Sequence, residues 1–209
     1  GKTAAFAIPI IQHLQALKNR DKSIKALILT PTRELALQIS ECIDDYAKYT
    51  QVRHGVIFGG VNQRAQVNML HKGVDILVAT PGRLLDLMNQ GYIHLDNVRH
   101  FVLDEADRML DMGFYEDIMQ IVKYLPKERQ TIMFSATMPA KIQQLAKTIL
   151  NNPAEIKLAV SRPADKIIQA AYVCYENQKL GIIRSLFAEQ TPERVIIFAS
   201  SKLKVKEVA

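Results

Sequence analysis

The sequence has little cysteine and no long hydrophobic run. Cys42 and Cys174 are its only cysteines, and they lie far apart, without the spacing of metal ligands. No apolar stretch approaches the about 20 residues that span a bilayer, and no apolar signal-peptide core follows Gly1. Low-complexity segments are also lacking. These absences argue against a disulfide framework, a zinc site and a membrane-spanning protein, and they indicate a reducing, cytosolic setting.

What is present is the composition of an ordinary folded protein. Hydrophobic residues make up 48% of the 209 residues and charged residues 23%, which excludes intrinsic disorder as the dominant state. The length predicts one domain, or one domain and part of a second. A net charge of +6 is compatible with a polyanionic partner such as RNA or DNA, although charge alone favours the simpler interpretation of a solvated surface.

Five short apolar runs share one plan along the chain. Each is followed by a small polar cluster and then by apolar residues at helical spacing, such as Leu35, Ile39 and Ile43. Continuous rather than alternating hydrophobicity is typical of strands covered on both faces of a parallel sheet. The sequence therefore predicts an α/β fold with a doubly wound parallel sheet, whose ligands bind beyond the carboxyl ends of the strands. The five predicted strands are Ala26–Leu29, Ile76–Ala79, Phe101–Leu103, Thr131–Phe134 and Val195–Phe198.

The C-terminal part of the chain is organised differently. Residues 161–166 contain proline and lack apolar periodicity, so we interpret them as a linker between a first lobe, residues 1–160, and the start of a second, residues 167–209. Three elements are too few for an independent sheet, so we expect the second domain to be truncated. The elements predicted after the linker are a strand (Ile168–Tyr175), a helix (Gln178–Glu189), a strand (Arg194–Phe198) and a charged helix (Lys202–Ala209).

The chain opens with a phosphate-binding signature. Gly1-Lys2-Thr3 precedes a helical run, Ala4–Leu17, and forms the end of the pattern G-x-x-x-x-G-K-[ST]. In that pattern backbone amides hold phosphates, the lysine reaches the β- and γ-phosphates, and the hydroxyl binds Mg²⁺. Alone, the triplet is weaker than the alternative of an ordinary helix start, and its weight comes from the motifs that follow.

A second signature is the acidic cluster Asp104-Glu105-Ala106-Asp107, which follows an apolar strand. An aspartate there can hold Mg²⁺ through water, and a neighbouring glutamate can orient and deprotonate a water that attacks a phosphate. Helix capping is the alternative, but three carboxylates in four residues exceed what a cap needs. Ser135-Ala136-Thr137 ends the next strand, and its hydroxyls either bond to Asp107 or belong to an ordinary strand-to-helix turn.

Two further segments repeat one arrangement at the same edge. Thr30-Pro31-Thr32-Arg33 and Thr80-Pro81-Gly82-Arg83 each follow a strand and precede a helix, which well-capped helices alone would explain. The arrangement also directs free backbone N–H groups and an arginine outward, twice, which suits an extended polyanion. Phe58-Gly59-Gly60 closes an apolar run from Gly55 and offers a close backbone approach for the same strand, or else a plain turn.

Together these segments resemble the DEAD-box RNA helicases of helicase superfamily two, most closely their bacterial RhlE-type branch. The resemblance extends over the whole chain, and the motifs follow in the family's order. Ile168-Gln169 with Tyr172-Val173 is similar to the family's entry into its second domain. The other matching segments are Gly-Lys-Thr (1–3), Pro-Thr-Arg-Glu-Leu-Ala-Leu-Gln (31–38), Gly-Gly (59–60), Thr-Pro-Gly-Arg (80–83), Val-Leu-Asp-Glu-Ala-Asp-Arg-Met-Leu-Asp-Met-Gly-Phe (102–114), Ser-Ala-Thr (135–137) and Val-Ile-Ile-Phe (195–198).

The resemblance implies RecA-like lobes and an RNA-stimulated ATPase that separates short RNA duplexes, with ATP and Mg²⁺ as cofactors. The implied nucleotide-binding residues are Gly1, Lys2, Thr3, Asp104 and Glu105, with Thr3 and Asp104 on Mg²⁺ and Glu105 as catalytic base. The residues implied to couple hydrolysis to RNA are Asp107, Ser135, Ala136 and Thr137. Those implied to grip the RNA backbone, without reading its sequence, are Pro31, Thr32, Arg33, Glu34, Gly59, Gly60, Thr80, Pro81, Gly82 and Arg83.

The chain departs from the family at both ends. Most of the phosphate loop and the adenine-recognising glutamine segment would precede Gly1, and the arginine finger would follow Ala209, so we expect a fragment with little activity of its own. Two other functions stay open: an RNA-binding module without turnover, and a DNA translocase of the same superfamily. Lys2, Asp104 and Glu105 favour turnover, and the Asp-Glu-Ala-Asp and Pro-Thr-Arg-Glu-Leu-Ala segments favour RNA.

Overall fold

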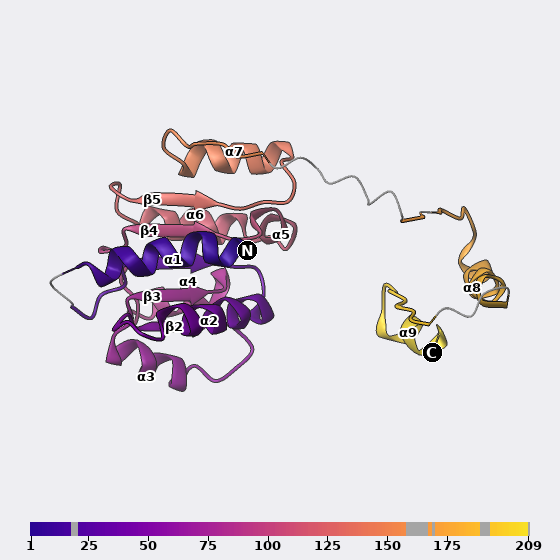
Figure 1. Ribbon diagram of the computed structural model, residues 1–209, viewed down its shortest axis with the longest axis horizontal. Coiled ribbons are helices and arrows are strands. Elements are labelled where there is room, and N and C mark those ends of the chain that lie inside the picture. Colours follow the sequence, from indigo (N-terminus) through magenta and orange to yellow (C-terminus); the bar gives the residue numbers. More distant parts are fainter. Residues whose placement is uncertain (18–20, 158–166, 169, 189–192, 209) are drawn as a thin grey trace. The chain divides into compact units, whose positions relative to one another are not determined.

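A computed structural model describes residues 1–17, 21–157, 167–168, 170–188 and 193–208 of the chain (Figure 1). The chain forms two compact units, Gly1–Glu155 and Ile156–Ala209. The predicted linker, residues 161–166, and the predicted lobe boundary at residue 160 lie outside the described residues. None of the helices within the described ranges is long and apolar enough to cross a membrane.

The first unit is built on one parallel sheet of five strands in the order β2-β3-β1-β4-β5. In the register, Leu29 at the end of β1 lies opposite Ala79 of β3 and Leu103 of β4. Since the strands are parallel, their carboxyl ends meet at one edge of the sheet. The strands are β1 (Ala26–Leu29), β2 (His54–Ile57), β3 (Ile76–Ala79), β4 (His100–Leu103) and β5 (Gln130–Met133).

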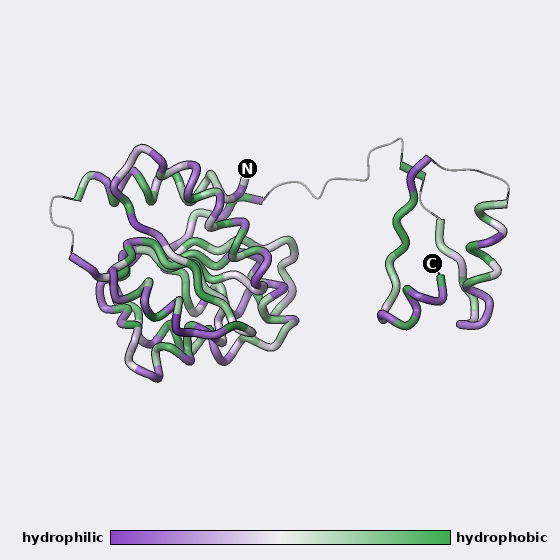
Figure 2. Tube along the Cα trace, turned by 90° about the horizontal axis from the view of Figure 1, so that it is seen from below, coloured by the Kyte–Doolittle hydropathy of each residue, from purple (hydrophilic) through white to green (hydrophobic). Residues whose placement is uncertain are grey.

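Helices cover both faces of this sheet (Figure 1). On one face α1 (Lys2–Gln15) and α2 (Arg33–Ala47) pack against Ala26 and Ile28 of β1. On the other face the alternate residues Leu27 and Leu29 join a second core. The helices of that face are α3 (Arg64–Lys72), α4 (Pro81–Asn89), α5 (Ala106–Asp111), α6 (Tyr115–Lys123) and α7 (Ala140–Ile149). Burial of both faces explains the continuous apolar strands, and Figure 2 shows these strands in the interior of the unit.

Four of the five predicted strands are confirmed to within one residue, and the predicted doubly wound α/β fold is confirmed. The sequence analysis missed β2, whose apolar run it had connected only with the Gly59-Gly60 pair. β2 is one of the two edge strands of the sheet, and two of its four residues, His54 and Val56, are only partly buried. Its burial alternates along the strand, so it lacks the continuous apolar pattern by which the other strands were recognised.

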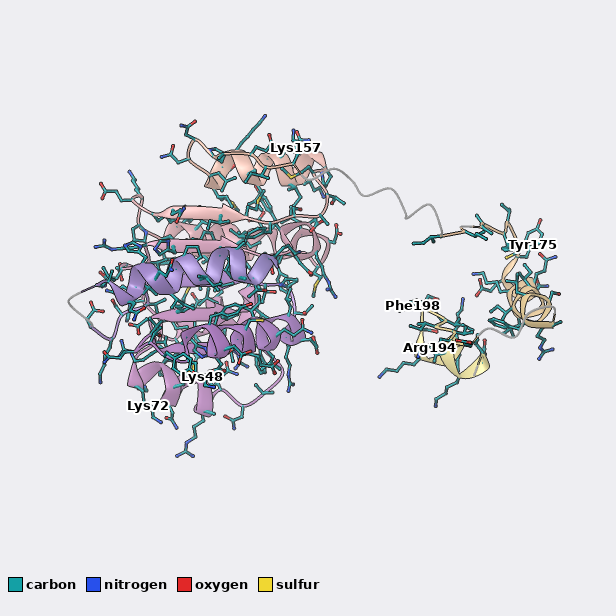
Figure 3. All side chains as sticks on the ribbon, viewed as in Figure 1. Lys48, Lys72, Lys157, Tyr175, Arg194 and Phe198 are labelled. Carbon is teal, nitrogen blue, oxygen red and sulfur yellow. The ribbon has the colours of Figure 1, made fainter. Side chains whose placement is uncertain are left out.

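The second unit contains a short 3₁₀ turn, Glu176–Gln178, followed by α8 (Lys179–Ala188) and α9 (Lys202–Val208). Both helices agree with the predicted ones to within one residue. The strands predicted at 168–175 and 194–198 are wrong, because the described residues of these segments form no strand. Their side chains are largely uncovered, since Ile196 is 81% exposed and Phe198 is 91% exposed. Figure 3 labels Phe198 on this segment. An apolar segment becomes a strand only when a neighbour pairs with its backbone, and none does so within the described part of this unit.

Candidate functional site

The carboxyl edge of the sheet gathers the segments that the sequence analysis singled out. The backbone ladder continues one residue beyond each inner strand, since the N–H of Thr30 donates to Ala79, that of Thr80 to Ile57 and that of Asp104 to Leu29. The N–H of Phe134 likewise donates to Leu103. The segments that follow β1 to β5 therefore begin next to one another, and all five lie along the carboxyl edge of the sheet.

Lys2 and Asp104 lie close together at this edge. The Nζ atom of Lys2, in the first turn of α1, lies 3.9 Å from Oδ1 of Asp104 at the end of β4. The Lys2 side chain is 62% exposed, whereas that of Asp104 is 4% exposed. Burial raises the pKa of the Asp104 carboxyl; the Lys2 ammonium and the backbone N–H of Glu105 oppose this rise, and the Glu105 charge adds to it. A buried carboxylate thus faces a lysine that stays open to solvent, with half-buried Thr3 next to it in the chain.

Glu105 has an unusual backbone conformation. It precedes α5 with φ 54° and ψ 53°, in the left-handed region that non-glycine residues rarely occupy. Two backbone bonds hold the turn: the N–H of Ala106 donates to Phe134, and that of Met109 donates to Glu105. The Glu105 carboxylate lies 3.2 Å from a guanidinium nitrogen of Arg108. Such conformations persist where the surrounding structure imposes them, and they cluster at functional sites.

Asp107 connects this cluster to the loop after β5. The backbone N–H and the hydroxyl of Thr137 both donate to Oδ2 of Asp107, each at 2.9 Å. The predicted contact between Asp107 and Thr137 is therefore confirmed. The Ser135 hydroxyl instead donates to the Thr137 carbonyl oxygen at 2.7 Å, with Ala136 between them. Partial burial alone would raise the pKa of Asp107, but the bonds from Thr137 and from the N–H of Arg108, with the nearby Ser135 hydroxyl, together hold it below its usual value.

The loop after β1 presents an exposed arginine. Thr32 caps α2, because its hydroxyl accepts the backbone N–H of Leu35 at 3.3 Å. Arg33 and Glu34 follow in the first turn and are exposed, while Pro31 is buried. The guanidinium carbon of Arg33 lies 4.8 Å from the ring centre of Phe58, the residue after β2. A cation–π contact with this ring therefore helps to hold the Arg33 guanidinium at the edge.

The loop after β2 begins with two exposed glycines. Gly59 and Gly60 are both exposed, and Gly60 has a φ of 78°, which favours glycine. A methyl group added at either glycine would meet no protein atom within 4 Å. The space next to these two residues is free for a ligand to approach the backbone.

The loop after β3 differs from its counterpart after β1. Thr80 and Pro81 begin α4 as predicted, with Pro81 in the first turn and Gly82 following it. The Arg83 side chain, however, is only 12% exposed. It donates to the carbonyl oxygen of Val61 at 3.1 Å and to Oε1 of Gln66 at 3.3 Å. The outward orientation predicted for both arginines is therefore wrong for Arg83, because protein acceptors surround its guanidinium.

Gln66 is the residue at this edge that the sequence analysis missed. It lies on α3, is buried, and bonds to Phe58 and Arg83. The signal that could have found it is its position: Met69 and Leu70, three and four residues later, lie on the apolar face of the same helix. A polar residue on that face requires buried hydrogen-bond partners.

Comparison with known proteins places the chain in a family. Residues 1–145 match the family described as DEAD/DEAH box helicase. The chain is 43% identical over 209 residues to the DEAD-box ATP-dependent RNA helicase RhpA of Helicobacter pylori (strain ATCC 700392 / 26695), and this match covers 100% of the chain and 42% of that protein. It is 39% identical over 210 residues to the DEAD-box ATP-dependent RNA helicase CshA of Bacillus subtilis (strain 168), again covering 100% of the chain and 42% of the relative.

The chain therefore spans less than half the length of these curated relatives. The matches do not single out the RhlE-type branch, and that finer assignment stays a prediction. The matched residues 1–145 contain the parallel sheet and all five loops of its carboxyl edge, from Lys2 to Thr137. By fold, by edge residues and by similarity, the chain belongs to the DEAD/DEAH box helicase family.

Proposed function

We propose that this chain is the nucleotide-binding part of an ATP-dependent RNA helicase, which uses RNA-stimulated ATP hydrolysis to separate short RNA duplexes. One observation carries the proposal: a solvent-open lysine at a helix N-terminus lies 3.9 Å from a buried carboxylate, next to a glutamate held in a strained turn. The relatives bear the name of ATP-dependent RNA helicases, which supports the same activity. Cys42 and Cys174 are free thiols, which supports a reducing, cytosolic setting.

The residues present fit a nucleoside triphosphate with Mg²⁺. The N-terminus of α1 carries Gly1, Lys2 and Thr3, and helix N-termini favour phosphate through free N–H groups and the helix dipole. The Asp104 carboxylate offers the hard oxygen ligands that Mg²⁺ prefers. Its charge is buried and the Lys2 ammonium lies 3.9 Å away, so a bound divalent cation would compensate that charge further. Thr3 and Asp104 would hold the ion, which when bound would neutralise charge on the phosphates.

Glu105 is positioned to act as the general base. It directly follows Asp104, and its left-handed backbone turns the chain from the strand into α5 at this point. Its carboxylate would accept the proton of the water that attacks the γ-phosphate. The ion pair with Arg108 is partly exposed, with side chains 31% and 57% exposed, so it holds the carboxylate only weakly.

The RNA would lie along the loops after β1, β2 and β3. Arg33 offers an exposed cation, Gly59 and Gly60 offer open backbone, and the first turn of α4, from Pro81, offers free N–H groups. Thr32, Glu34, Thr80 and Gly82 belong to the same loops. Contacts of this kind bind phosphate and sugar, so we propose that recognition is tolerant of RNA sequence.

The experiment is ATP turnover by the intact protein with RNA, with DNA and with neither, for the wild type and for Glu105→Gln. We expect stimulation by RNA but not by DNA, and about a 10²–10⁴-fold loss in the variant with ATP binding retained, because only the base is removed. Glu41→Gln, an exposed change on α2, is the matched control and should keep wild-type turnover. Equal stimulation by DNA would favour a translocase, and RNA binding without turnover would favour a binding module; either result would overturn the proposal.

A further inference from the structure

The side chain of Gln66 forms hydrogen bonds with the backbone next to an edge strand. Phe58 follows β2 at the edge of the sheet, where no further strand pairs with its backbone within the described residues. The carboxamide of Gln66 takes that place: Oε1 accepts the N–H of Phe58 at 3.3 Å, and Nε2 donates to its carbonyl oxygen at 3.1 Å. One side chain thereby satisfies both backbone groups of the residue that precedes the Gly59-Gly60 pair.

Arg83 fixes Gln66 and also the far side of the turn. Its Nη1 donates to Oε1 of Gln66 at 3.3 Å, while its Nη2 donates to the carbonyl oxygen of Val61 at 3.1 Å. The turn from Phe58 to Val61 is therefore held at both ends by one buried assembly. Two donors on Oε1 also define the orientation of the amide, because its nitrogen could not accept them.

Phe58 extends the same assembly to Arg33. The Phe58 side chain is 9% exposed, and its ring lies 4.8 Å from the guanidinium carbon of Arg33. A shift of the Phe58 backbone would move this ring and the cation on it. A continuous series of contacts therefore connects the inward-turned Arg83 to the exposed Arg33 through Gln66 and Phe58.

The Arg83 charge is poorly placed for a direct phosphate contact. Two hydrogen-bond acceptors occupy its guanidinium, the Asp86 carboxylate lies 3.7 Å away, and only 12% of the side chain is exposed. Gly59 and Gly60 have the opposite character, since the space where a side chain would stand is open. The ligand-facing part of the assembly is the glycine pair, and the supporting part is Gln66 with Arg83.

We propose that Gln66 and Arg83 are positioning residues, which hold the Phe58–Val61 turn and Arg33 in the geometry that binds an RNA backbone. The proposal rests on the proposed function for its ligand, but the hydrogen-bonded assembly itself is independent of it.

The first test needs no RNA. Hydrogen exchange of the backbone amides is followed by NMR in the wild type, Gln66→Leu and Arg83→Ala, with Gln90→Leu as the control for loss of a carboxamide outside the assembly. We expect the Phe58 amide to exchange at least tenfold faster in the first two variants, with amides of β1 and β4 unchanged, because Gln66 is its acceptor. An unchanged Phe58 amide would overturn the proposed assembly whether or not the protein binds RNA.

The second test is a double-mutant cycle on single-stranded RNA binding, measured by fluorescence anisotropy between low and moderate salt. We expect Gln66→Leu and Arg83→Ala each to weaken binding by about tenfold and the double variant by no more than either alone, since both break one unit. Arg33→Ala serves as the direct-contact reference, and its log–log salt slope should fall by about 0.7. If Arg83→Ala and Gln66→Leu add, and only Arg83→Ala flattens the slope, Arg83 binds phosphate itself and the proposal is wrong.

If Gln66→Leu does not fold, Arg83→Lys tests the same inference. Lysine retains the positive charge but lacks the fork that reaches Gln66 and Val61 together. We expect it to bind RNA as weakly as Arg83→Ala at a temperature where both are folded; binding at the wild-type level would refute a positioning role. Wild-type protein that binds no RNA, with the Phe58 amide protected as expected, would instead count against the proposed function alone.

Discussion

Thr137 donates twice to one oxygen of Asp107, through its backbone N–H and its hydroxyl, both at 2.9 Å. Thr137 lies in the loop after β5, and Asp107 lies in the first turn of α5, which follows β4; the two segments are neighbours because these strands pair. Asp107 belongs to the same four-residue cluster as Asp104 and Glu105. The loop after β5 is therefore hydrogen-bonded directly to the cluster that faces the nucleotide in our proposal.

We predict that Thr137→Val in the intact protein separates RNA unwinding from ATP turnover. Valine has nearly the same shape and keeps the backbone N–H that donates to Asp107, but it lacks the hydroxyl donor. A hydrogen bond to a charged group contributes about 1.5–3 kcal/mol, or about tenfold or more in a rate. Unwinding per ATP hydrolysed should fall by about that factor. The control is Thr148→Val, which removes a hydroxyl bonded only to the Gln144 carbonyl in α7. Equal losses of unwinding and turnover would contradict a coupling role.

Asp104→Asn should make the nucleotide-free protein more stable while abolishing its hydrolysis. Burial raises the pKa of Asp104, so above the pKa of the unfolded carboxyl the negative charge costs more in the native state than in the unfolded one. Asparagine removes this cost and can still accept the N–H of Glu105. The expected gain at pH 7 is about 1 kcal/mol, or about 2–4 °C in melting temperature.

Thermal unfolding without nucleotide, with Asp96→Asn as the exposed control, measures this effect. A lower melting temperature for Asp104→Asn would mean that the pair with Lys2 stabilises the fold by more than burial of the charge destabilises it. The interpretation of Asp104 as a functional residue that is held at a cost in stability would then be wrong.

The sequence predicted those parts of the fold that depend on local pattern. Strands β1, β3 and β4 are buried along their whole length because both sheet faces are covered, and the resulting apolar pattern is visible without a structure. The edge strand β5 is less buried and was recognised from the apolar residues at its end, Ile132 and Met133. β2 was not predicted, because buried and partly buried residues alternate along it at the sheet edge. The segment at Val195–Phe198 has the same apolar pattern as the inner strands, but pattern alone cannot supply the neighbouring strand that its backbone requires.

The candidate site also has a part that local pattern predicts and a part that depends on tertiary contacts. Lys2, Asp104 and Thr137 were predicted together, because parallel strands bring their carboxyl ends to one edge and each motif directly follows a strand or begins a helix. The orientation of Arg83 was not predictable, because it depends on Gln66 and on the Val61 carbonyl oxygen, which are 17 and 22 residues away in the sequence. Tertiary contacts alone thus give the arginines of two segments with the same local pattern different orientations.

Gly59→Ala should leave the protein folded and stable but weaken its binding to RNA. Gly59 does not have a left-handed backbone, and an added methyl group would meet no protein atom, so the substitution should stabilise the fold by about 0.4–1 kcal/mol. Nothing in the described structure requires a glycine at this position. The methyl group would, however, occupy the space through which an RNA backbone approaches.

Parallel thermal melts and RNA-binding measurements on Gly59→Ala check this prediction, and Gly91→Ala and Gly60→Ala provide contrasts. Gly60 has a φ of 78°, so alanine there should destabilise the turn as well as weaken binding. Gly91 also has a φ of 78° but follows the end of α4, so its substitution should cost stability and leave binding unchanged. RNA affinity at the wild-type level in Gly59→Ala would contradict a close approach at this turn.

His100 should make the stability of the first unit decrease as the pH falls below neutral. It is 7% exposed; its Nε2 lies 2.7 Å from Nδ1 of His13, and its Nδ1 lies 3.1 Å from Oε1 of Gln130. Burial lowers the pKa of His100, as do the nearby His13 and Arg99, and the bond to Gln130 only partly opposes this. With Gln130 as acceptor, His100 carries its proton on Nδ1 and its Nε2 accepts from His13. A second proton would place two N–H groups against each other.

Because the pKa of His100 is lower in the folded state, the unfolded chain takes up a proton first as the pH falls through about 6.5, and the native state loses stability from there down to the folded pKa. We expect the melting temperature of the wild type to fall between pH 7 and 5.5, and His100→Asn, which keeps a donor toward Gln130, to remove that part of the fall. His94→Asn, at an exposed histidine six residues earlier, should retain the wild-type pH dependence. If His100→Asn and the wild type lose stability in parallel over this range, another group is responsible and the neutral state assigned to His100 is wrong.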